Sequence, residues 1–258
     1  MAKIKMEFVA ASVMKSIEVI AYLPAFNGFP GPEPPFKTVY FLPGMADSAE
    51  TISEMAGFLK YSQSTGMAIV TFASDNSFYV DRPMACYGQL IEEVISNTRQ
   101  ILPLSDRRED TYLAGYSMGG YGAFCQCMRR PDLFAKAALA APGFDAYQLI
   151  NPFIGGPMIP HEYLDTLFTS EEEYNNSANN YRIALKQFLD AGKELPELCL
   201  CAGRQDPLVK DVVEAFRTFL DENNVAYSYQ LVDGAHDQMF VDNMMPVIMN
   251  FFAVKSRG

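Results

Sequence analysis

The sequence has no apolar run long enough to cross a membrane, and its first ten residues alternate charged and apolar side chains instead of forming a secretory leader. Basic residues are scarce, because 20 Lys and Arg stand against 31 Asp and Glu, which gives a formal net charge of −11. Such a charge repels nucleic acid and anionic membrane surfaces. We therefore expect a cytoplasmic protein whose partner is a small neutral molecule, with no nucleic acid and no membrane involved.

The sequence also lacks the Cys-x-x-Cys spacing of redox and zinc sites. Its five cysteines include two Cys-x-Cys pairs, Cys125 with Cys127 and Cys199 with Cys201. On a strand, Cys199 and Cys201 would share one face, which indicates reduced core thiols in a cytosolic protein. We expect neither a metal site nor an organic cofactor.

The 258 residues suffice for one large packed domain, since 49% are hydrophobic and 20% are charged. Two amphipathic strands, in 3–9 and 13–21, predict an N-terminal antiparallel hairpin, and the Pro/Gly-rich segment 24–35 predicts a surface loop. From residue 38 onward, short apolar runs are followed by helical segments. That alternation predicts a mostly parallel, doubly wound sheet with helices on both faces, in a single α/β domain over 1–258.

The expected elements can be given by residue range. Strands are predicted at 38–42, 67–72, 111–115, 136–141, 197–203 and 226–232, and helices near 48–60, 87–102, 118–130, 208–222 and 238–253. Residues 143–195 interrupt the alternation with two Pro/Gly clusters, an acidic run and one helical stretch near 181–191. An insertion between core strands commonly covers the strand ends where ligands bind, so we expect a small cap or lid; a solvated excursion is the alternative.

A G-x-S-x-G pattern occurs in residues 115–119, which read GYSMG between a predicted strand and a predicted helix. This is the context of a nucleophile elbow, a strained turn in which side chains flanking the serine would collide. The pattern predicts Ser117 as a nucleophile. The structural alternative is a glycine-rich helix start that only turns the chain or binds an anion.

A serine hydroxyl needs a general base, usually histidine, and the sequence has only two histidines. His236 follows the predicted strand 226–232, whereas His161 lies in the insertion, before any candidate acid on the following strand. The chain order of such sites is serine, acid, histidine, which selects His236 as the base. We expect His161 to be a lid or surface residue.

The acid should follow a core strand between the serine and the histidine. Asp206 comes directly after the strand 197–203 and would hold the other imidazole N–H. It could also cap the next helix, with Pro207 at the first helical position, and both roles can hold together. The alternative acids are Asp145, Asp211, Asp233 and Asp237.

An oxyanion hole requires two backbone N–H groups, one after the nucleophile and one in the loop after the strand 38–42. Met118 follows the serine, and Met45 stands beside Gly44 in the loop. We predict the backbone N–H groups of Met45 and Met118 as the donors.

With these motifs placed, the sequence resembles the esterase D or tributyrin esterase family of α/β hydrolases, which is related to the feruloyl esterases and S-formylglutathione hydrolases. The resemblance is carried by VYFLPGMADSAETI (39–52), NSFY…YGQLIEEVI (76–95), YLAGYSMGGYGAF (112–124), PDLFAKAALAAPGFD (131–145), GRQD (203–206) and GAHDQMF (234–240). It implies the α/β-hydrolase fold, the same triad and the same oxyanion donors. Two positions depart from the family pattern: Pro43 replaces a histidine before the oxyanion glycine, and Gln238 replaces an aromatic residue after the His-Asp pair.

The resemblance implies a serine esterase that hydrolyses short-chain carboxylic esters, such as tributyrin, acetyl or feruloyl esters, through an acyl-enzyme. A thioesterase similar to S-formylglutathione hydrolase and an acyltransferase would use the same triad. A non-catalytic binding protein on this fold is the remaining alternative, although such proteins usually lose a triad member. The sequence leaves the oligomeric state, including a homo-oligomer, open.

Overall fold

The protein is described by a computed structural model that covers residues 2–24, 31–157 and 159–254. Most of the Pro/Gly-rich segment predicted as a surface loop, residues 25–30, lies outside the described residues. Residues 31–35 of that segment are exposed, whereas Pro24 at its start is buried.

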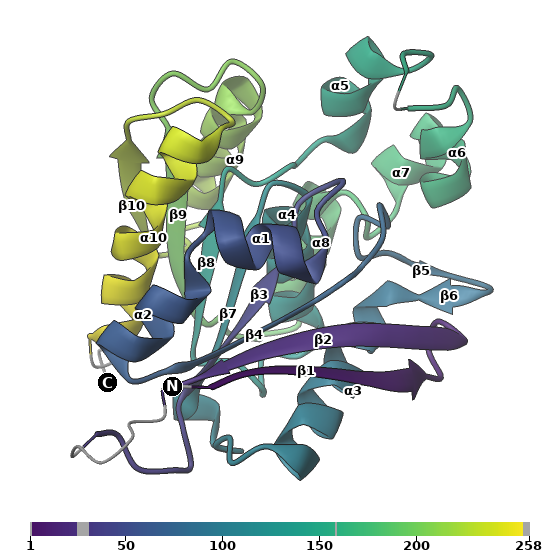
Figure 1. Ribbon diagram of the computed structural model, residues 1–258. Helices are drawn as coiled ribbons and strands as arrows, with labels where there is room; N and C mark the ends of the chain where they lie inside the picture. Colours follow the sequence, from purple (N-terminus) through teal and green to yellow (C-terminus); the bar gives the residue numbers. More distant parts are fainter. Residues whose placement is uncertain (1, 25–30, 158, 255–258) are drawn as a thin grey trace.

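One eight-stranded sheet runs through the molecule in the order β1-β2-β4-β3-β7-β8-β9-β10 (Figure 1). β1 pairs antiparallel with β2, and β2 pairs antiparallel with β4, whereas all other neighbours in the sheet are parallel. The strands are β1 (Ala2–Ala10), β2 (Lys15–Leu23), β3 (Thr38–Leu42), β4 (Ala68–Phe72), β7 (Thr111–Tyr116), β8 (Lys136–Ala140), β9 (Glu197–Gly203) and β10 (Tyr227–Val232). The predicted N-terminal hairpin and mostly parallel sheet are therefore confirmed.

Helices cover both faces of the sheet, as predicted. α1 (Ala49–Met55), α2 (Phe58–Thr65) and α10 (Gln238–Ala253) contact one another and lie on one face. The other face carries α3 (Tyr87–Ile101), α4 (Met118–Arg129), α8 (Tyr181–Asp190) and α9 (Lys210–Glu222). The strands β3, β4, β7 and β8 are buried along their whole length, because helices cover them on both sides.

Two helical regions differ from the prediction. The helix expected near 48–60 is two helices, because Gly57 has a positive φ of 62° and separates α1 from α2. The insertion holds α5 (Ala146–Ile150), the 3-10 turn η2 (Asn151–Phe153), α6 (Tyr163–Phe168) and α7 (Glu171–Asn176) besides α8. Helices of five or six residues show too little periodicity to be predicted, and here buried Leu164, Phe168 and Tyr174 hold them.

The shorter elements are a two-stranded sheet, formed by β5 (Asp81–Arg82) and β6 (Ala85–Cys86), and the 3-10 turn η1 (Arg108–Asp110). Figure 1 shows α5, α6 and α7 together as a lobe beyond the carboxyl ends of the central strands. α8 returns to the main body and packs on α4. Among the described helices, none combines the length and apolar character needed to cross a membrane.

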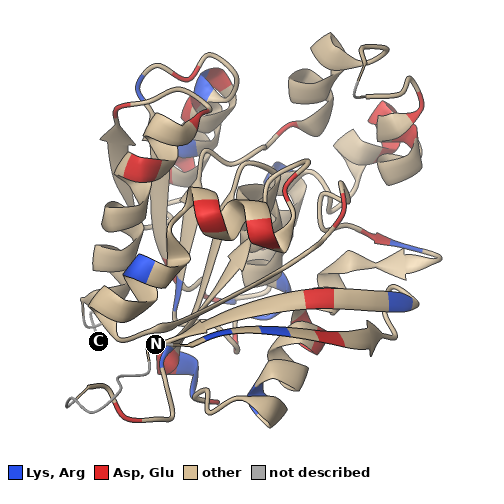
Figure 2. Cartoon of the chain, in the orientation of Figure 1, with Lys and Arg blue, Asp and Glu red and all other residues tan. Residues whose placement is uncertain are grey.

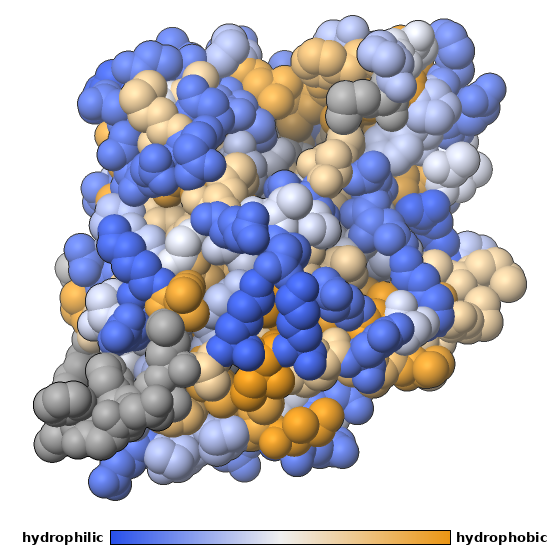
Figure 3. All heavy atoms as spheres, viewed as in Figure 1, coloured by the Kyte–Doolittle hydropathy of each residue, from blue (hydrophilic) through white to orange (hydrophobic). Residues whose placement is uncertain are grey.

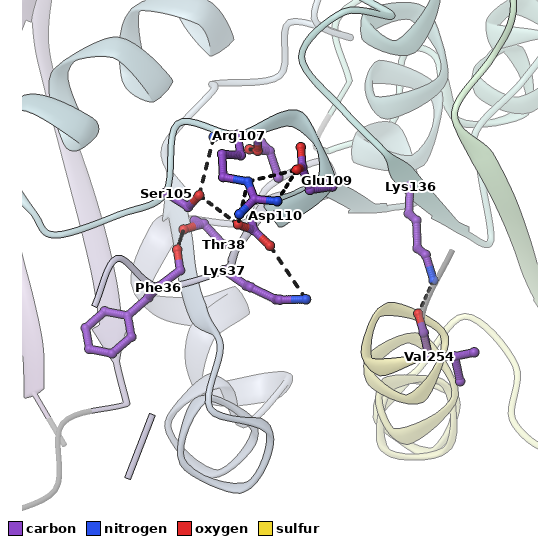
Figure 4. A network of polar contacts seen from close by, with 10 residues as sticks. Phe36, Lys37, Thr38, Ser105, Arg107, Glu109, Asp110, Lys136 and Val254 are labelled. Carbon is purple, nitrogen blue, oxygen red and sulfur yellow. Dashed lines mark hydrogen bonds and ion pairs between the residues drawn. The ribbon is translucent and has the colours of Figure 1, made fainter. Parts of the chain in front are cut away.

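The amino ends of the strands are held by polar contacts, shown in Figure 4. Asp110 accepts a hydrogen bond from the Ser105 hydroxyl at 2.9 Å and lies 3.6 Å from the Lys37 ammonium, which ties the start of β7 to the start of β3. Lys136, at the start of β8, is buried and donates a hydrogen bond to the carbonyl of Val254, just after α10. The end of the sheet opposite the α5–α7 lobe is thereby fixed.

Candidate active site

Ser117 lies between β7 and α4 with φ 55° and ψ −117°, a conformation that non-glycine residues rarely adopt. Backbone hydrogen bonds hold it there. Its N–H donates to the carbonyl of Ala140 at 2.9 Å, and its own carbonyl accepts from the N–H groups of Gly120 and Gly143, both at 2.9 Å. A strained residue persists only when its surroundings fix it, and such residues concentrate at functional sites.

The two glycines of the motif are required by close packing. A Cβ atom on Gly115 would lie 2.0 Å from the carbonyl oxygen of Gly119, and a Cβ atom on Gly119 would lie 2.0 Å from that of Leu42. Real Cβ atoms do not approach backbone so closely. The glycines therefore let α4 start directly against β7 and the end of β3, which leaves the serine on the turn.

Three of the predicted residues meet in a continuous hydrogen-bonded chain. His236 Nε2 lies 2.9 Å from Ser117 Oγ, and His236 Nδ1 lies 2.9 Å from Asp206 Oδ2. The three residues come from three loops, each at the carboxyl end of a strand: β7, β9 and β10. The structure thus brings together side chains that are 119 and 30 positions apart.

Asp206 is buried, with 1% of its surface exposed. Burial opposes its charged form, but hydrogen bonding to His236, attraction to that ring when it is protonated, and the N–H groups of Leu208 and Val209 outweigh burial, so the pKa of Asp206 is lowered. An ionised carboxylate only accepts hydrogen bonds, so Nδ1 of His236 carries the proton and Nε2 is free to accept one from Ser117. That arrangement suits a general base.

Asp206 also has the alternative role that the sequence left open. Its Oδ1 accepts from the N–H groups of Leu208 at 2.9 Å and Val209 at 3.2 Å. α9 itself begins only at Lys210, so Asp206 holds the turn that leads into the helix. One oxygen orients the imidazole and the other fixes the turn.

Two of the alternative acids form ion pairs with arginines. Asp145 lies 2.9 Å from Arg182 of α8, and Asp233 lies 3.1 Å from Arg204. Each pairing draws a carboxylate to a guanidinium rather than to the imidazole. The structure therefore does not bring Asp145 or Asp233 into the hydrogen-bonded chain.

The other two alternative acids belong to helix starts. Asp237 caps α10, where its carboxylate accepts from the N–H of Phe240 at 3.0 Å. Asp211 is exposed in the first turn of α9. Both are favourable positions for an acidic residue near the positive end of a helix.

His161 lies in the insertion and is exposed. Its ring packs against Gly155, since a Cβ atom on that glycine would lie 2.6 Å from the imidazole Cε1. The missing side chain of Gly155 makes room for this contact, and its positive φ of 79° is a conformation that glycine adopts readily. His161 therefore has a packing role within the lobe.

The loop predicted to supply the second oxyanion donor lies against the serine. A Cβ atom on Gly44 would be 3.5 Å from Ser117 Cβ, and Met45 follows it in a half-buried position. Met118 is the first residue of α4, and the first N–H groups of a helix have no partner within it. Both predicted donors thus lie next to Ser117.

Two side chains of the site were missed by sequence reasoning. The ring of Tyr116 stacks on the imidazole of His236, and half-buried Asp47 lies beside Gly44. Burial raises the pKa of Asp47. Tyr116 occupies a variable position of the G-x-S-x-G pattern, and nothing in that pattern says which side chain would face it.

Gln238, one of the two residues that depart from the family pattern, has a structural role. Gln238 Nε2 donates to the carbonyl of Met55 at 2.8 Å and to Asp242 Oδ1 at 2.8 Å. It thereby joins the first turn of α10 to the end of α1. An aromatic side chain at this position could not make these bonds.

The α5–α7 lobe packs on the body through aromatic residues. Phe78, after β4, lies edge-on to Phe168 of α6 at 6.1 Å between centroids and to Tyr121 of α4 at 5.8 Å. Figure 3 shows apolar side chains at the top of the molecule, between the region where α10 starts and this lobe. Over the described residues, no group of three or more His, Cys, Asp or Glu side chains is placed to hold a metal ion.

The sequence is similar to a known protein family and to a known enzyme. The family model described as "Putative esterase" matches residues 10–240. An acetyl esterase of Caldicellulosiruptor saccharolyticus is 24% identical, over 93% of this chain and 94% of that protein.

Solved structures show the same fold. Fluorophosphonate-binding serine hydrolase F of Staphylococcus aureus superposes with a TM-score of 0.87 at 24% identity, covering 98% of both chains. An S-formylglutathione hydrolase of the same organism gives 0.86 at 23%, covering 98% of this chain and 99% of that one. A ferulic acid esterase of Anaeromyces mucronatus gives 0.64 at 17%, covering 98% and 90%.

Proposed function

The chain belongs to the Esterase family and is a serine esterase of the α/β-hydrolase fold, and on that premise we propose that Ser117, His236 and Asp206 are its catalytic triad. We propose further that it hydrolyses small, uncharged carboxylic esters with short acyl groups. The observation that carries the first proposal is the unbroken hydrogen-bonded chain from Ser117 Oγ through His236 to Asp206.

The first half of the reaction forms an acyl-enzyme. His236 Nε2 accepts the hydroxyl proton while Ser117 Oγ attacks the ester carbonyl carbon, and the carbonyl oxygen becomes an oxyanion. The ring then carries a positive charge, which the Asp206 carboxylate stabilises. When the tetrahedral intermediate collapses, the C–O bond to the alcohol breaks and His236 returns its proton to the departing alkoxide.

The second half repeats these steps with water. His236 removes a proton from a water molecule that attacks the acyl carbon, and the proton then returns to Ser117 Oγ as the carboxylic acid leaves. In both halves the backbone N–H groups of Met45 and Met118 donate to the oxyanion. Donors that are fixed before the reaction need no rearrangement when the charge appears, which is why they lower the barrier.

The charges around the site support an uncharged substrate. Segments 44–59, 143–181 and 233–240, which include the loops beside the serine and the histidine, contain acidic residues but no Lys or Arg. Arg182 and Arg204, just outside them, are paired with Asp145 and Asp233. Figure 2 shows acidic residues on α1 and in the α6–α7 region. A substrate with carboxylates, such as a glutathione thioester, would find no cation on these segments, whereas a neutral ester carries no charge to be repelled.

The relatives support a short acyl group. The curated relative is an acetyl esterase, while the similar structures include an S-formylglutathione hydrolase and a ferulic acid esterase. The formyl and acetyl groups are small, so two of these three proteins act on short acyl groups. The charge of this site favours the ester over the glutathione thioester.

We further propose a cytoplasmic location, supported by the cysteines. All five are free thiols, and Cys127, Cys199 and Cys201 are buried. Unpaired cysteines are usual in a reducing compartment. A small ester is the proposed partner, and the acidic composition argues against nucleic acid.

Labelling and a pair of substrates that are similar in shape but differ in charge test the proposed function. A fluorophosphonate probe should label the wild-type protein and not Ser117→Ala. Methyl 4-acetoxybenzoate should be hydrolysed with a kcat/KM about tenfold or more above that of the anionic 4-acetoxybenzoate at low salt, and added salt should narrow the gap. Labelling of Ser117→Ala would refute the triad, and equal rates for the two esters would refute the charge preference.

A further inference from the structure

The segment that follows β4, residues 74–80, lies next to the oxyanion loop and has an unusual backbone. Phe78 and Tyr79 both have positive φ, 49° and 56°, although neither is glycine. Each such residue costs free energy and persists only where surrounding contacts require it. The contacts of this segment show what it is fixed to.

Tyr79 connects the segment to the start of the oxyanion loop. Its hydroxyl accepts a hydrogen bond from the Ser74 hydroxyl at 2.8 Å and donates one to the carbonyl of Pro43 at 3.0 Å. The ring is buried against α4, where a Cβ atom on Gly122 would lie 2.3 Å from its Cδ2. Burial raises the pKa of Tyr79, so the hydroxyl keeps its proton and can donate at neutral pH.

Asn76 connects the same segment to the other side of the loop. Its Oδ1 accepts from the N–H of Ala46 at 2.8 Å, and Ala46 itself has a positive φ of 67°. The carbonyl of Asn76 accepts from the hydroxyl of Tyr163 in α6 at 2.8 Å. One segment therefore contacts the oxyanion loop at two points and the insertion at a third.

We propose that Tyr79 and Asn76 are positioning residues that aim the Met45 N–H at the oxyanion, which gives the 74–80 segment a role in catalysis. The inference rests on the proposed function of the triad and names residues beyond it. Neither side chain touches the reacting atoms.

The geometry of three successive peptide units carries the argument. A peptide unit is planar, so a hydrogen bond to its carbonyl or its N–H fixes the orientation of the whole plane. Tyr79 holds the Pro43–Gly44 plane through its carbonyl, and Asn76 holds the Met45–Ala46 plane through its N–H. The plane between them carries the Met45 N–H, and it is therefore held from both sides.

Such bracing matters because the loop contains Gly44. Glycine allows wide rotation of the backbone, and an unbraced Gly44–Met45 plane could turn its N–H away from the site. Pro43 precedes this glycine, and a proline side chain has no hydrogen-bonding group that could hold the loop in place. The hydroxyl of Tyr79 provides the contact from outside.

Tyr79→Phe is the test, because it removes the hydroxyl and keeps the ring that packs on Gly122. We expect kcat for a neutral acetyl ester to fall about 10- to 100-fold, since small misplacements of catalytic groups cost that much, while KM stays within about twofold. Affinity for an aryl trifluoromethyl ketone, which forms an oxyanion on the serine, should fall in parallel with kcat/KM.

Tyr40→Phe is the matched control. Tyr40 is a buried tyrosine on β3 whose hydroxyl lies 3.1 Å from that of Thr98, away from the oxyanion loop. The two variants should show similar losses in Tm, but Tyr40→Phe should retain kcat and ketone affinity. Asn76→Ala should reproduce the kcat and ketone effects of Tyr79→Phe in weaker form.

The outcomes separate this inference from the proposed function. Tyr79→Phe with wild-type kcat, or with lowered kcat but unchanged ketone affinity, would overturn the positioning role. Equal kinetic losses in Tyr40→Phe would also overturn it, because the effect would then be general destabilisation. In each of these cases, fluorophosphonate labelling and ester hydrolysis by the wild-type protein would still support the proposed triad. A wild-type protein that is neither labelled nor able to hydrolyse esters would refute both the triad and the positioning role.

Discussion

The ring of Tyr116 lies nearly parallel to the imidazole of His236, with 4.9 Å between the ring centroids and 25° between the planes. Tyr116 also lies close to parallel with Phe240 of α10, at 6.0 Å. The residue before Ser117 thus supports the imidazole of His236. This contact, together with the Asp206 hydrogen bond, fixes the direction in which Nε2 points.

Replacement of Tyr116 tests that support. Tyr116→Leu removes the flat surface behind the imidazole, so we expect kcat to fall about tenfold, because small errors in orientation are costly. Tyr116→Phe keeps the ring and should retain kcat within about twofold. Steady-state kinetics on a neutral ester would check both, and an equal loss in the two variants would mean that the hydroxyl, not the ring, is important.

The two histidines should respond differently to removal. His236→Ala should lower kcat by about 10⁴ to 10⁶, because the serine loses its base. His161→Ala removes a surface ring that packs on Gly155 and should change mainly KM, or nothing. Equal losses of kcat would show that the insertion takes part in the chemistry.

Two substitutions of Asp206 should separate its role in orienting His236 from its role in holding the turn. Asp206→Asn keeps an oxygen that can accept from the N–H groups of Leu208 and Val209, so the free energy of unfolding should change little. The NH2 group of the asparagine would then lie opposite the Nδ1–H of His236, and two donors cannot form a hydrogen bond with each other. We expect kcat to fall by up to about 10⁴, because the charge is lost and the tautomer is wrong. Asp206→Ala should show the same loss of kcat and lower the free energy of unfolding by about 1 kcal/mol or more.

Kinetics and denaturation midpoints for both Asp206 variants would distinguish the roles. An Asp206→Asn enzyme with kcat within a few fold of the wild type would mean that Asp206 only holds the turn. The acid would then have to be sought elsewhere, although Asp145 and Asp233 are already paired with arginines.

Lys136 provides a prediction about stability alone. Its ammonium donates to the carbonyls of Phe251 and Val254, at the carboxyl end of α10, where a positive charge is favourable. Lys136→Met fills a similar volume but leaves both carbonyls without this donor, so the free energy of unfolding should fall by about 1 to 3 kcal/mol. The kcat should stay unchanged, and chemical denaturation with kinetics on the same sample would check both expectations.

The sequence predicts best where a local steric rule operates. The glycines at 115 and 119 are needed because two backbones touch there, and both residues are visible in the motif itself. The order of strands and helices was also predictable, because each of these elements depends on a short stretch of neighbouring residues. All six predicted core strands are present.

Contacts between distant segments could not be predicted in the same way. Sequence order made Asp206 the first choice of acid, but only the structure shows which carboxylates point at the imidazole and which pair with Arg182 or Arg204. Tyr116 and Tyr79 were missed because their roles depend on what lies across from them in space. The short helices of the insertion depend on buried side chains rather than on their own periodicity.

The hydrogen bond from Tyr163 to the backbone of Asn76 has a consequence for engineering. It attaches the insertion directly to Asn76, one of the two residues proposed to position the oxyanion loop, so the part of the chain that can be varied to admit new substrates is also attached to the part that sets the rate. A chimaera that takes its 143–195 segment from a relative would change turnover as well as selectivity. Retaining a tyrosine at the position of Tyr163 would let the two properties be altered separately.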